Sequence, residues 1–237
     1  MSTARIAEIA TIDIRLSTAP WNFTTERAAE IEANWQSRLR DNPALYNGKI
    51  LLTDKIALST APATARLEGA CFVAEYKAFQ AWRDFGWPGE VKNLFAMAAL
   101  RSADGAYLLG EMAPWTANAG QIYFPCGTPD LDDLAGERLD LEGSMWRELR
   151  EETGFTDTDF AEAPGWSVVF DGALIACMKR LQSPLPAADL LARASAFLAR
   201  DKNPELVRLV PVFGAADIGA GVPDLMRAWL KNAFDSV

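Results

Sequence analysis

One predicted helix, residues 141–153, constrains the fold of this chain most strongly. Asp140 can cap its first turn, and Gly154 can end it. Apolar residues recur every four positions between these two ends, so one face of the helix must be buried against other structure. These apolar residues are Leu141, Met145 and Leu149. The helix ends in the sequence RELREETGF (147–155), where charge is concentrated beside the buried face.

Three glutamates lie beside the apolar stripe of this helix: Glu148, Glu151 and Glu152. At about 100° per residue they fall within an arc of roughly 100°. Carboxylates that converge repel one another unless a divalent cation lies among them, and oxygen ligands without histidine or cysteine favour Mg²⁺ or Mn²⁺. A solvated helix end with ion pairs, such as Arg147 with Glu151, is the alternative interpretation of the same charges.

Composition excludes several kinds of chemistry. The 237 residues include no histidine, which removes the Ser-His-Asp and Cys-His mechanisms and histidine-ligated zinc. The formal net charge of -9 opposes binding to the phosphate backbone of nucleic acid, so we expect no nucleic-acid partner. An anionic small substrate remains compatible with this charge if a bound cation offsets the local field.

The expected location follows from the absence of targeting signals. The first twenty residues lack the apolar core of a signal peptide, and no later run reaches the roughly 20 apolar residues of a membrane span. The three cysteines, which are widely spaced, suggest neither a disulfide framework nor a zinc site. We therefore expect a cytoplasmic protein with no membrane partner. The sequence does not decide the oligomeric state, and a homodimer stays open.

Hydrophobic periodicity and turn residues predict an α/β fold with a mixed sheet. We place a domain boundary at the GWPGE segment, which gives an α+β extension at 1–90 and a second domain at 91–237. Helices are expected at 25–40, 76–85, 141–153, 186–200 and 223–234, with Thr24 or Thr25 as the cap of the first and Trp82 on the inner side of the second. Strands are expected at 5–16, 49–52, 92–101, 106–112, 121–124, 166–170, 173–181 and 206–212. Two Asp-Gly turns, at 104–105 and 171–172, predict hairpins.

The pattern RELxEExGF resembles the second half of the Nudix box, the signature of hydrolases that cleave a nucleoside diphosphate linked to another moiety. The preceding segment GxxxFPxG, residues 120–127, resembles the strand and turn before that box, with Cys126 in place of a glycine. This resemblance implies a Nudix-like α/β/α sandwich. It also implies Mg²⁺-dependent hydrolysis of the diphosphate linkage, with release of a nucleoside monophosphate.

The resemblance assigns roles to particular residues. It implies that Glu148, Glu151 and Glu152 bind one or more Mg²⁺ or Mn²⁺ ions, while Arg147 holds a carboxylate in position. The ions would neutralise the diphosphate and activate water. A further carboxylate in such enzymes often precedes a later strand. Glu205 is our candidate for it, followed by Asp171 and Glu162.

The first half of the box is degenerate. Leu139 stands where the family has a glutamate, eight positions before Arg147. Three nearby acidic residues are candidates to substitute for it: Glu137, Asp140 and Glu142. This departure leaves open a second hypothesis, in which the chain is a nucleotide-binding module with weak or no catalysis. An interaction domain whose acidic helix binds no metal is a third hypothesis.

Sequence motifs of individual Nudix subfamilies narrow the range of expected substrates. The proline- and serine-rich sequence of the NADH-cleaving type is absent, and so are the two upstream arginines of the coenzyme A type. The first 90 residues, with an NPxLYNG turn and a YKAFQAWRDFG helix, are loosely similar to the extension of UDP-glucose-cleaving members. We therefore expect a nucleotide sugar or an ADP-ribose-like substrate. Trp115 and Tyr123, with Trp166 as a further candidate, could stack on its base.

Overall fold

The computed structural model describes residues 4–59 and 64–235. Contacts within the chain divide it into two compact units. Unit 1 comprises residues 1–10, 95–127 and 141–237, and unit 2 comprises residues 11–94 and 128–140. This division differs from the expected boundary at residue 90 in three segments: 1–10, 91–94 and 128–140. The N-terminal segment belongs to unit 1 because residues 5–9 add a strand to its sheet, and the segment 128–140 belongs to unit 2 because it pairs with strands there.

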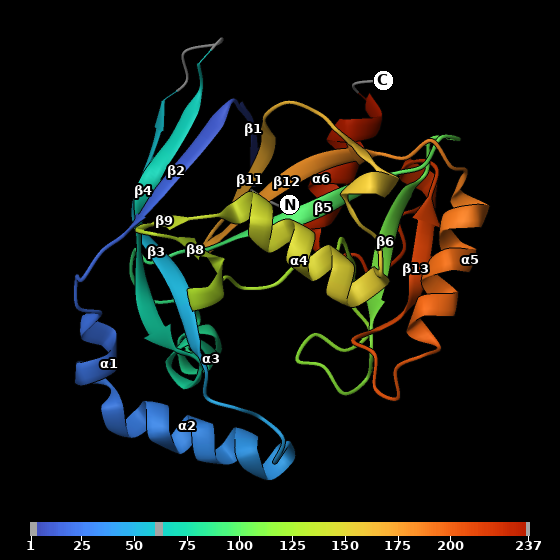
Figure 1. Cartoon of the computed structure of the whole chain (residues 1–237). Coiled ribbons are helices and arrows are strands. Elements are labelled where there is room, and N and C mark those ends of the chain that lie inside the picture. The colour runs from blue at the N-terminus through green and yellow to red at the C-terminus, as the bar shows by residue number, and fades with distance from the viewer. Residues whose placement is uncertain (1–3, 60–63, 236–237) are drawn as a thin grey trace. The chain divides into compact units, whose positions relative to one another are not determined.

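Unit 1 is built on an eight-stranded sheet (Figure 1). The main order is β1-β11-β12-β5-β6-β13, while β10 pairs with β12 and β7 pairs with β6. The strands are β1 (Arg5–Ile9), β5 (Asn93–Arg101), β6 (Tyr107–Met112), β7 (Ile122–Tyr123), β10 (Ala161–Glu162), β11 (Trp166–Asp171), β12 (Leu174–Gln182) and β13 (Leu206–Val212). Both predicted hairpins are present, since β5 pairs with β6 and β11 pairs with β12.

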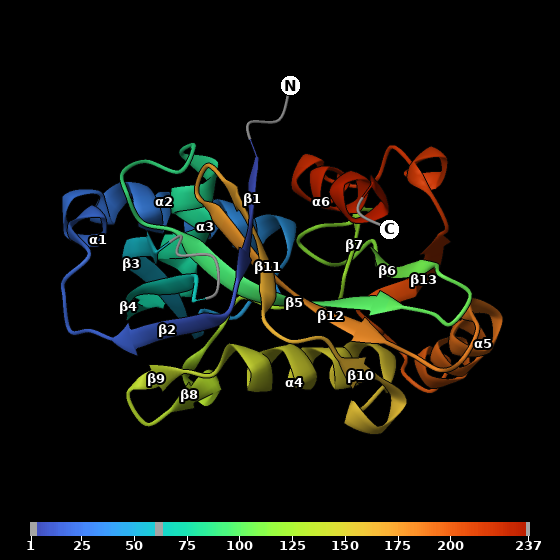
Figure 2. The same ribbon diagram turned by 90° about the horizontal axis from the view of Figure 1, so that it is seen from above.

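Helices cover both faces of this sheet (Figure 2). α4 (Leu141–Thr153) and α5 (Ala187–Leu198) lie on one face, and α6 (Asp224–Asp235) lies on the other. α4 buries its predicted stripe, while α6 buries Trp229, whose indole N–H donates to Ser167 Oγ over 3.0 Å. The α/β class and the α/β/α sandwich expected from the sequence are therefore confirmed for unit 1.

Unit 2 contains a five-stranded sheet in the order β3-β4-β2-β9-β8. Its strands are β2 (Thr11–Leu16), β3 (Lys49–Ser59), β4 (Arg66–Glu75), β8 (Leu134–Ala135) and β9 (Arg138–Leu139). The sheet is mixed, because β2 and β4 are parallel and the other pairs are antiparallel. Its helices are α1 (Asn22–Glu26), α2 (Ala28–Asp41) and α3 (Tyr76–Asp84). Trp82 on α3 is fully buried, on the inner side as predicted.

Three local expectations for the first part of the chain were wrong. The single strand at 5–16 is two strands, because β1 pairs with β11 in unit 1 and β2 pairs with β4 in unit 2. The helix at 25–40 is interrupted at Arg27, and Thr24 and Thr25 do not cap it. Their hydroxyls instead donate to backbone carbonyls one turn back, over 2.8 and 2.9 Å.

Three short 3-10 turns complete the described chain: Leu131–Asp133, Asp157–Asp159 and Ala215–Asp217. Each precedes or follows a strand or helix at the surface. In the described ranges, no helix combines the length and the apolar character that crossing a membrane requires.

Candidate active site

The acidic helix of the sequence prediction is α4, and its observed bounds are those predicted. Leu149 and Met145 are fully buried, which fixes the rotation of the helix about its axis. The Thr153 hydroxyl donates to the Leu149 carbonyl over 2.5 Å, and the Gly154 N–H donates to the Arg150 carbonyl over 2.9 Å. The second half of α4 therefore presents its glutamates in a defined direction.

These glutamates line a pocket of about 450 Å³ within unit 1. Its walls come from the second half of α4, the end of α5 and the segment before β13. The lining residues are Glu148, Glu151, Glu152, Phe197, Leu198, Arg200, Asp201, Pro204 and Glu205. The structure thus brings together the three helix glutamates and Glu205, although more than fifty residues of sequence separate Glu152 from Glu205.

Glu152 is the most deeply buried member of this group, with 5 % of its surface exposed. Its Oε2 atom has no hydrogen-bond partner. Burial raises the pKa of this carboxyl well above its ordinary value, and the charges of Glu148 and Glu205 raise it further. A backbone hydrogen bond from Cys126 acts in the opposite direction. Glu152 is therefore a buried acceptor, and no basic side chain of the described residues forms an ion pair with it.

Arg147 supports the exposed side of the cluster. Its guanidinium lies 2.8 Å from Glu148 Oε1 and 3.4 Å from Glu151 Oε2. The pair with Glu151 is the one that the helical spacing predicted. Glu148 is the better buried partner, since 15 % of its side chain is exposed against 61 % for Glu151. Arg147 thus holds two of the three helix carboxylates in place.

The turn Pro125-Cys126-Gly127 lies against the same carboxylates. A β-carbon at Gly127 would overlap the carboxylate of Glu148, so glycine allows the close approach of the two segments. The pKa of the Cys126 thiol is well above its usual value because the thiol is buried and lies near Glu152 and Glu148. This turn therefore forms a tightly fitted neighbour of the acidic cluster.

The residues present suit a hard divalent cation. The donors are carboxylate oxygens, one of them buried and unpartnered, and cations are the groups that stabilise such an arrangement. Among the residues that the structure describes, no three Asp, Glu or Cys side chains already form a complete ligand cluster. Binding of a cation would thus require side-chain rotation within the pocket.

The alternative candidates for a further carboxylate lie elsewhere. Lys179 binds Glu142 over 3.0 Å and Glu162 over 3.1 Å, and Glu162 also accepts a hydrogen bond from the Trp146 indole. Asp171 is at the hairpin end of β11, paired with Leu174. None of these three acidic residues lines the pocket, whereas Glu205 does.

No acidic residue near Leu139 takes the place of the missing box glutamate among the pocket-lining residues. Leu139 itself is buried in β9 of unit 2. Glu137 and Asp140 also belong to unit 2, and Glu142 binds Lys179.

The proposed base-stacking residues differ in their surroundings. Trp115 is 52 % exposed in the segment after β6, and Tyr123 is buried on β7, where its hydroxyl accepts a hydrogen bond from Asn118 over 3.0 Å. Burial raises the pKa of Tyr123. Trp166 is buried beneath the ammonium group of Lys179, 5.1 Å from its ring centroid. None of the three lines the acidic pocket.

Sequence reasoning did not identify Phe197, Arg200 or Asp201 as pocket residues. They lie at and just after the end of α5, and no local pattern links that helix end to α4. Arg200 is the basic residue in the lining of the pocket, so its side chain is well placed to contact an anionic ligand there.

No protein-family model and no curated protein sequence matches the chain. Solved structures that are similar to it include a MutT protein and a Nudix hydrolase. A MutT protein from Methanosarcina mazei Go1 is 19% identical, and the match has a TM-score of 0.38 over 61% of this chain and 95% of that chain. The Nudix hydrolase RenU from M. smegmatis is 15% identical, with a TM-score of 0.35 over 61% of this chain and 85% of that chain.

Proposed function

We propose that the chain is a Mg²⁺- or Mn²⁺-dependent Nudix hydrolase. It would cleave the diphosphate linkage of a nucleoside diphosphate joined to another moiety and release a nucleoside monophosphate. The observation that carries this proposal is the shared pocket of Glu148, Glu151, Glu152 and Glu205, in which Glu152 is buried with Oε2 unpartnered. The box motif on α4 supplies the link to diphosphate chemistry.

The pocket side chains divide into those that bind the ion and those that organise the substrate. Glu148, Glu151 and Glu152 would hold a divalent ion, which supplies positive charge for the diphosphate and makes an attacking water more acidic. Arg147 keeps Glu148 and Glu151 from separating. Arg200 offers a positive charge to a phosphate oxygen.

A carboxylate must also accept the proton of the attacking water. Glu151 and Glu205 both line the pocket and are the candidates for this base. The Ala113 N–H donates to the Glu205 carbonyl over 2.8 Å, which fixes the backbone from which this side chain reaches the pocket. The backbone of Glu205 is therefore held in place across the pocket from α4.

The expected substrate is a nucleotide sugar or an ADP-ribose-like compound. The loose likeness of the first 90 residues to UDP-glucose-cleaving members supports this class. The exposed indole of Trp115 offers a surface for stacking of a base.

A nucleotide-binding module without turnover is the second candidate. The buried Leu139 at a box glutamate position favours it, because the pocket then has one carboxylate fewer than the complete motif would provide. Such a module would bind Mg²⁺ and nucleotide through the same glutamates but would not activate water efficiently.

Turnover distinguishes these two candidates. Nucleotide sugars, ADP-ribose, dinucleoside polyphosphates and coenzyme A are incubated with Mg²⁺, and release of nucleoside monophosphate is measured. The enzyme hypothesis expects turnover of at least one substrate and a loss of about 100-fold or more in Glu152→Gln. Saturable nucleotide binding with no hydrolysis across the panel would instead support the module.

A further inference from the structure

The acidic pocket of unit 1 is also lined by three apolar residues, Phe197, Leu198 and Pro204. Phe197 and Leu198 end α5, and Pro204 lies shortly before β13. The proposed hydrolase function assigns roles to the glutamates and to Arg200 but none to these three residues, which we call the apolar wall. The apolar wall is therefore available for a part of the substrate that carries no charge.

The Phe197 ring packs directly on the end of α4. A β-carbon added at Gly154 would overlap the ring, so the ring lies against the backbone of that glycine. Gly154 directly follows α4, whose last turn carries Glu151 and Glu152. Phe197 is partly exposed and lines the pocket, so part of its ring surface is open to a ligand. An aromatic surface thus lies next to the carboxylates that would hold the ion.

The charged part of the pocket determines where a phosphate can bind. Glu152 is 5 % exposed with its Oε2 atom unpartnered, which favours a bound cation beside it. Arg200 adds a positive charge, and its backbone N–H donates to the Phe197 carbonyl over 3.0 Å. The other charged lining residues are acidic and repel anions. A phosphate should therefore lie by Arg200 and the ion, which leaves the apolar wall for a neutral group.

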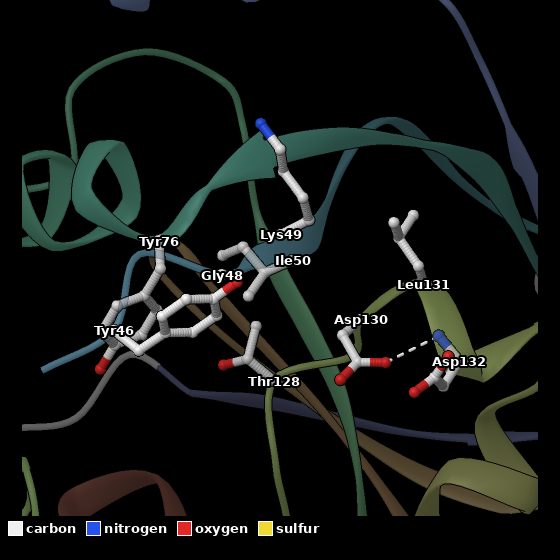
Figure 3. Close-up of a pocket in the computed structure, with 9 residues that line it drawn as sticks. All are labelled: Tyr46, Gly48, Lys49, Ile50, Tyr76, Thr128, Asp130, Leu131 and Asp132. Atoms are coloured by element: carbon white, nitrogen blue, oxygen red, sulfur yellow. Dashed lines mark hydrogen bonds between the residues drawn. The ribbon is translucent and has the colours of Figure 1, made fainter.

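The unit 2 pocket is a second place where an aromatic ring could contact a nucleotide (Figure 3). Its volume is about 490 Å³, and Tyr46 is among its lining residues. Asp130 and Asp132 also line it, and both carboxylates repel phosphate. Lys49, the basic residue in its lining, pairs with Glu75 over 3.1 Å and points away from both aspartates in Figure 3. The charges of this pocket therefore disfavour a nucleotide.

From this arrangement we infer that Phe197 is the residue on which the base of the nucleotide stacks. The inference rests on the proposed hydrolase function and specifies it further. The nucleoside half of the substrate lies at the end of α5, with its base on Phe197 and its phosphates toward Arg200 and the ion. A flat, uncharged base stacks well on an aromatic ring. The pocket volume of about 450 Å³ falls within the range of small-molecule sites, roughly 300–1,000 Å³.

Trp115 is the competing stacking residue, because its indole is 52 % exposed. It does not line the acidic pocket, whereas Phe197 does. A base on Trp115 would therefore leave the apolar wall without a ligand contact. Phe197 is favoured because it shares one pocket with the carboxylates that would hold the ion.

The test compares nucleoside monophosphates with ribose 5-phosphate, which lacks a base. AMP, GMP, CMP, UMP and ribose 5-phosphate are titrated into the full chain with Mn²⁺ by isothermal titration calorimetry. We expect at least one nucleotide to bind about tenfold more tightly than ribose 5-phosphate, because stacking on an aromatic ring contributes a factor of this order. Phe197→Leu should remove most of this advantage and leave the binding of Mn²⁺ and ribose 5-phosphate unchanged.

Two variants serve as controls, and the melting temperature shows whether each variant is folded. Phe197→Tyr keeps an aromatic ring and should keep the advantage of the nucleotide. Tyr46→Leu changes the unit 2 pocket and should keep it as well. With Mg²⁺ in place of Mn²⁺, nuclear Overhauser effects between the base protons and the Phe197 ring test the contact in the wild type without a substitution.

Three results would overturn the inference and leave the proposed hydrolase function standing. They are equal binding of nucleotides and ribose 5-phosphate by the wild type, an advantage that survives in Phe197→Leu, and the absence of Overhauser effects to Phe197 from a bound nucleotide. Loss of the advantage in Trp115→Leu but not in Phe197→Leu would assign the base to Trp115 instead. No Mn²⁺-dependent binding of any of these phosphates would overturn both the inference and the proposed function.

Discussion

The backbone of Gly127 lies against the carboxylate of Glu148, with no room for a β-carbon between them. This contact couples the turn after β7 to the helix that carries the acidic cluster. A methyl group at position 127 must displace either the turn or the Glu148 side chain. Because the turn is also hydrogen-bonded to Glu152 through Cys126, either movement disturbs the arrangement of the two carboxylates.

Gly127→Ala should therefore weaken the acidic site. We expect a loss of less than about 1 kcal/mol in the free energy of unfolding, because the obstructing atoms are the end of a flexible side chain, but a fall of about tenfold or more in Mn²⁺ affinity. Denaturant unfolding and Mn²⁺ titration followed by water-proton relaxation measure the two effects. Gly214→Ala is the matched control, because nothing lies within 4 Å of an added β-carbon there. Equal effects at the two glycines would contradict the steric argument.

Glu152→Gln should change the pH dependence of stability. Burial raises the pKa of Glu152 in the folded state above its ordinary value of 4.5. Above that value the folded state binds more protons than the unfolded state, so the free energy of unfolding falls as pH rises between the two pKa values. Glutamine cannot ionise, so the variant does not lose stability by burying a charged carboxylate. Without divalent ions the variant should thus melt at a higher temperature than the wild type at pH 7.

With Mg²⁺ added, the wild type should melt at a higher temperature than Glu152→Gln. An ion at 100 times its dissociation constant stabilises the folded wild type by about 2.7 kcal/mol, and Glu152→Gln should lose most of this gain. Scanning calorimetry with and without Mg²⁺ measures both effects. Glu26→Gln, an exposed position on α1, should behave as the wild type in both conditions. A wild type that gains no stability from Mg²⁺ or Mn²⁺ would contradict this prediction.

Local patterns were sufficient to predict most elements of unit 1, with the bounds of β1 and the short strand β10 as exceptions. The four-residue apolar spacing with Gly154 at the end gave the bounds of α4, and the Asp-Gly turns gave both hairpins. The run 5–16 could not be divided correctly, because it is rich in isoleucine and alanine throughout and contains no turn residue between β1 and β2. What separates them is pairing with strands far away in the chain, β11 for one and β4 for the other.

In the candidate site, too, local sequence predicts some of the neighbouring residues, and packing between distant segments supplies the others. Glu148, Glu151 and Glu152 share a helix face, so their proximity follows from helical geometry alone. Glu205 was placed with them only by family resemblance, and the pocket contains it. Arg200 and Asp201 had no signal in the sequence, since the packing of α5 beside α4 brings them to the pocket.

Lys179→Met should destabilise unit 1. The Lys179 side chain is 8 % exposed, and its ammonium group lies between Glu142 and Glu162 and over the ring of Trp166. Methionine has a side-chain volume similar to that of lysine but no charge, so the carboxylates of Glu142 and Glu162 then repel each other. We expect a loss of about 1–2 kcal/mol in the free energy of unfolding at pH 7. Arg66→Met, which breaks a pair whose partners are both half exposed, should cost less than about 0.5 kcal/mol.

This cluster should also respond to alkaline pH. Burial alone would lower the pKa of Lys179, but its hydrogen bonds to Glu142 and Glu162 raise it overall above the ordinary 10.5. A raised lysine pKa adds stability that is complete below 10.5 and is lost as pH rises through the folded-state value. The difference in stability between wild type and Lys179→Met should therefore shrink above pH 10.5. A constant difference up to the alkaline limit of folding would contradict the role of this charge.

Gly154→Ala separates two reasons for the glycine that ends α4. Gly154 has a φ of +75°, and an added β-carbon would also overlap the ring of Phe197. Gly120 has nearly the same φ, +74°, but nothing lies within 4 Å of an added β-carbon. Gly120→Ala should cost only the backbone strain, about 1–2 kcal/mol. Gly154→Ala should cost about 1–3 kcal/mol more, because Phe197 must move.

Phe197 also lines the acidic pocket, so its displacement should reach the site itself. Gly154→Ala is thus expected to lower Mn²⁺ affinity as well as stability, whereas Gly120→Ala should lower stability alone. Denaturant unfolding and Mn²⁺ titration of the two variants provide the comparison. The double variant Gly154→Ala/Phe197→Ala removes the obstructing ring and should recover part of the lost Mn²⁺ affinity. If that recovery does not occur, the glycine is required for its backbone conformation and not for the room it leaves for Phe197.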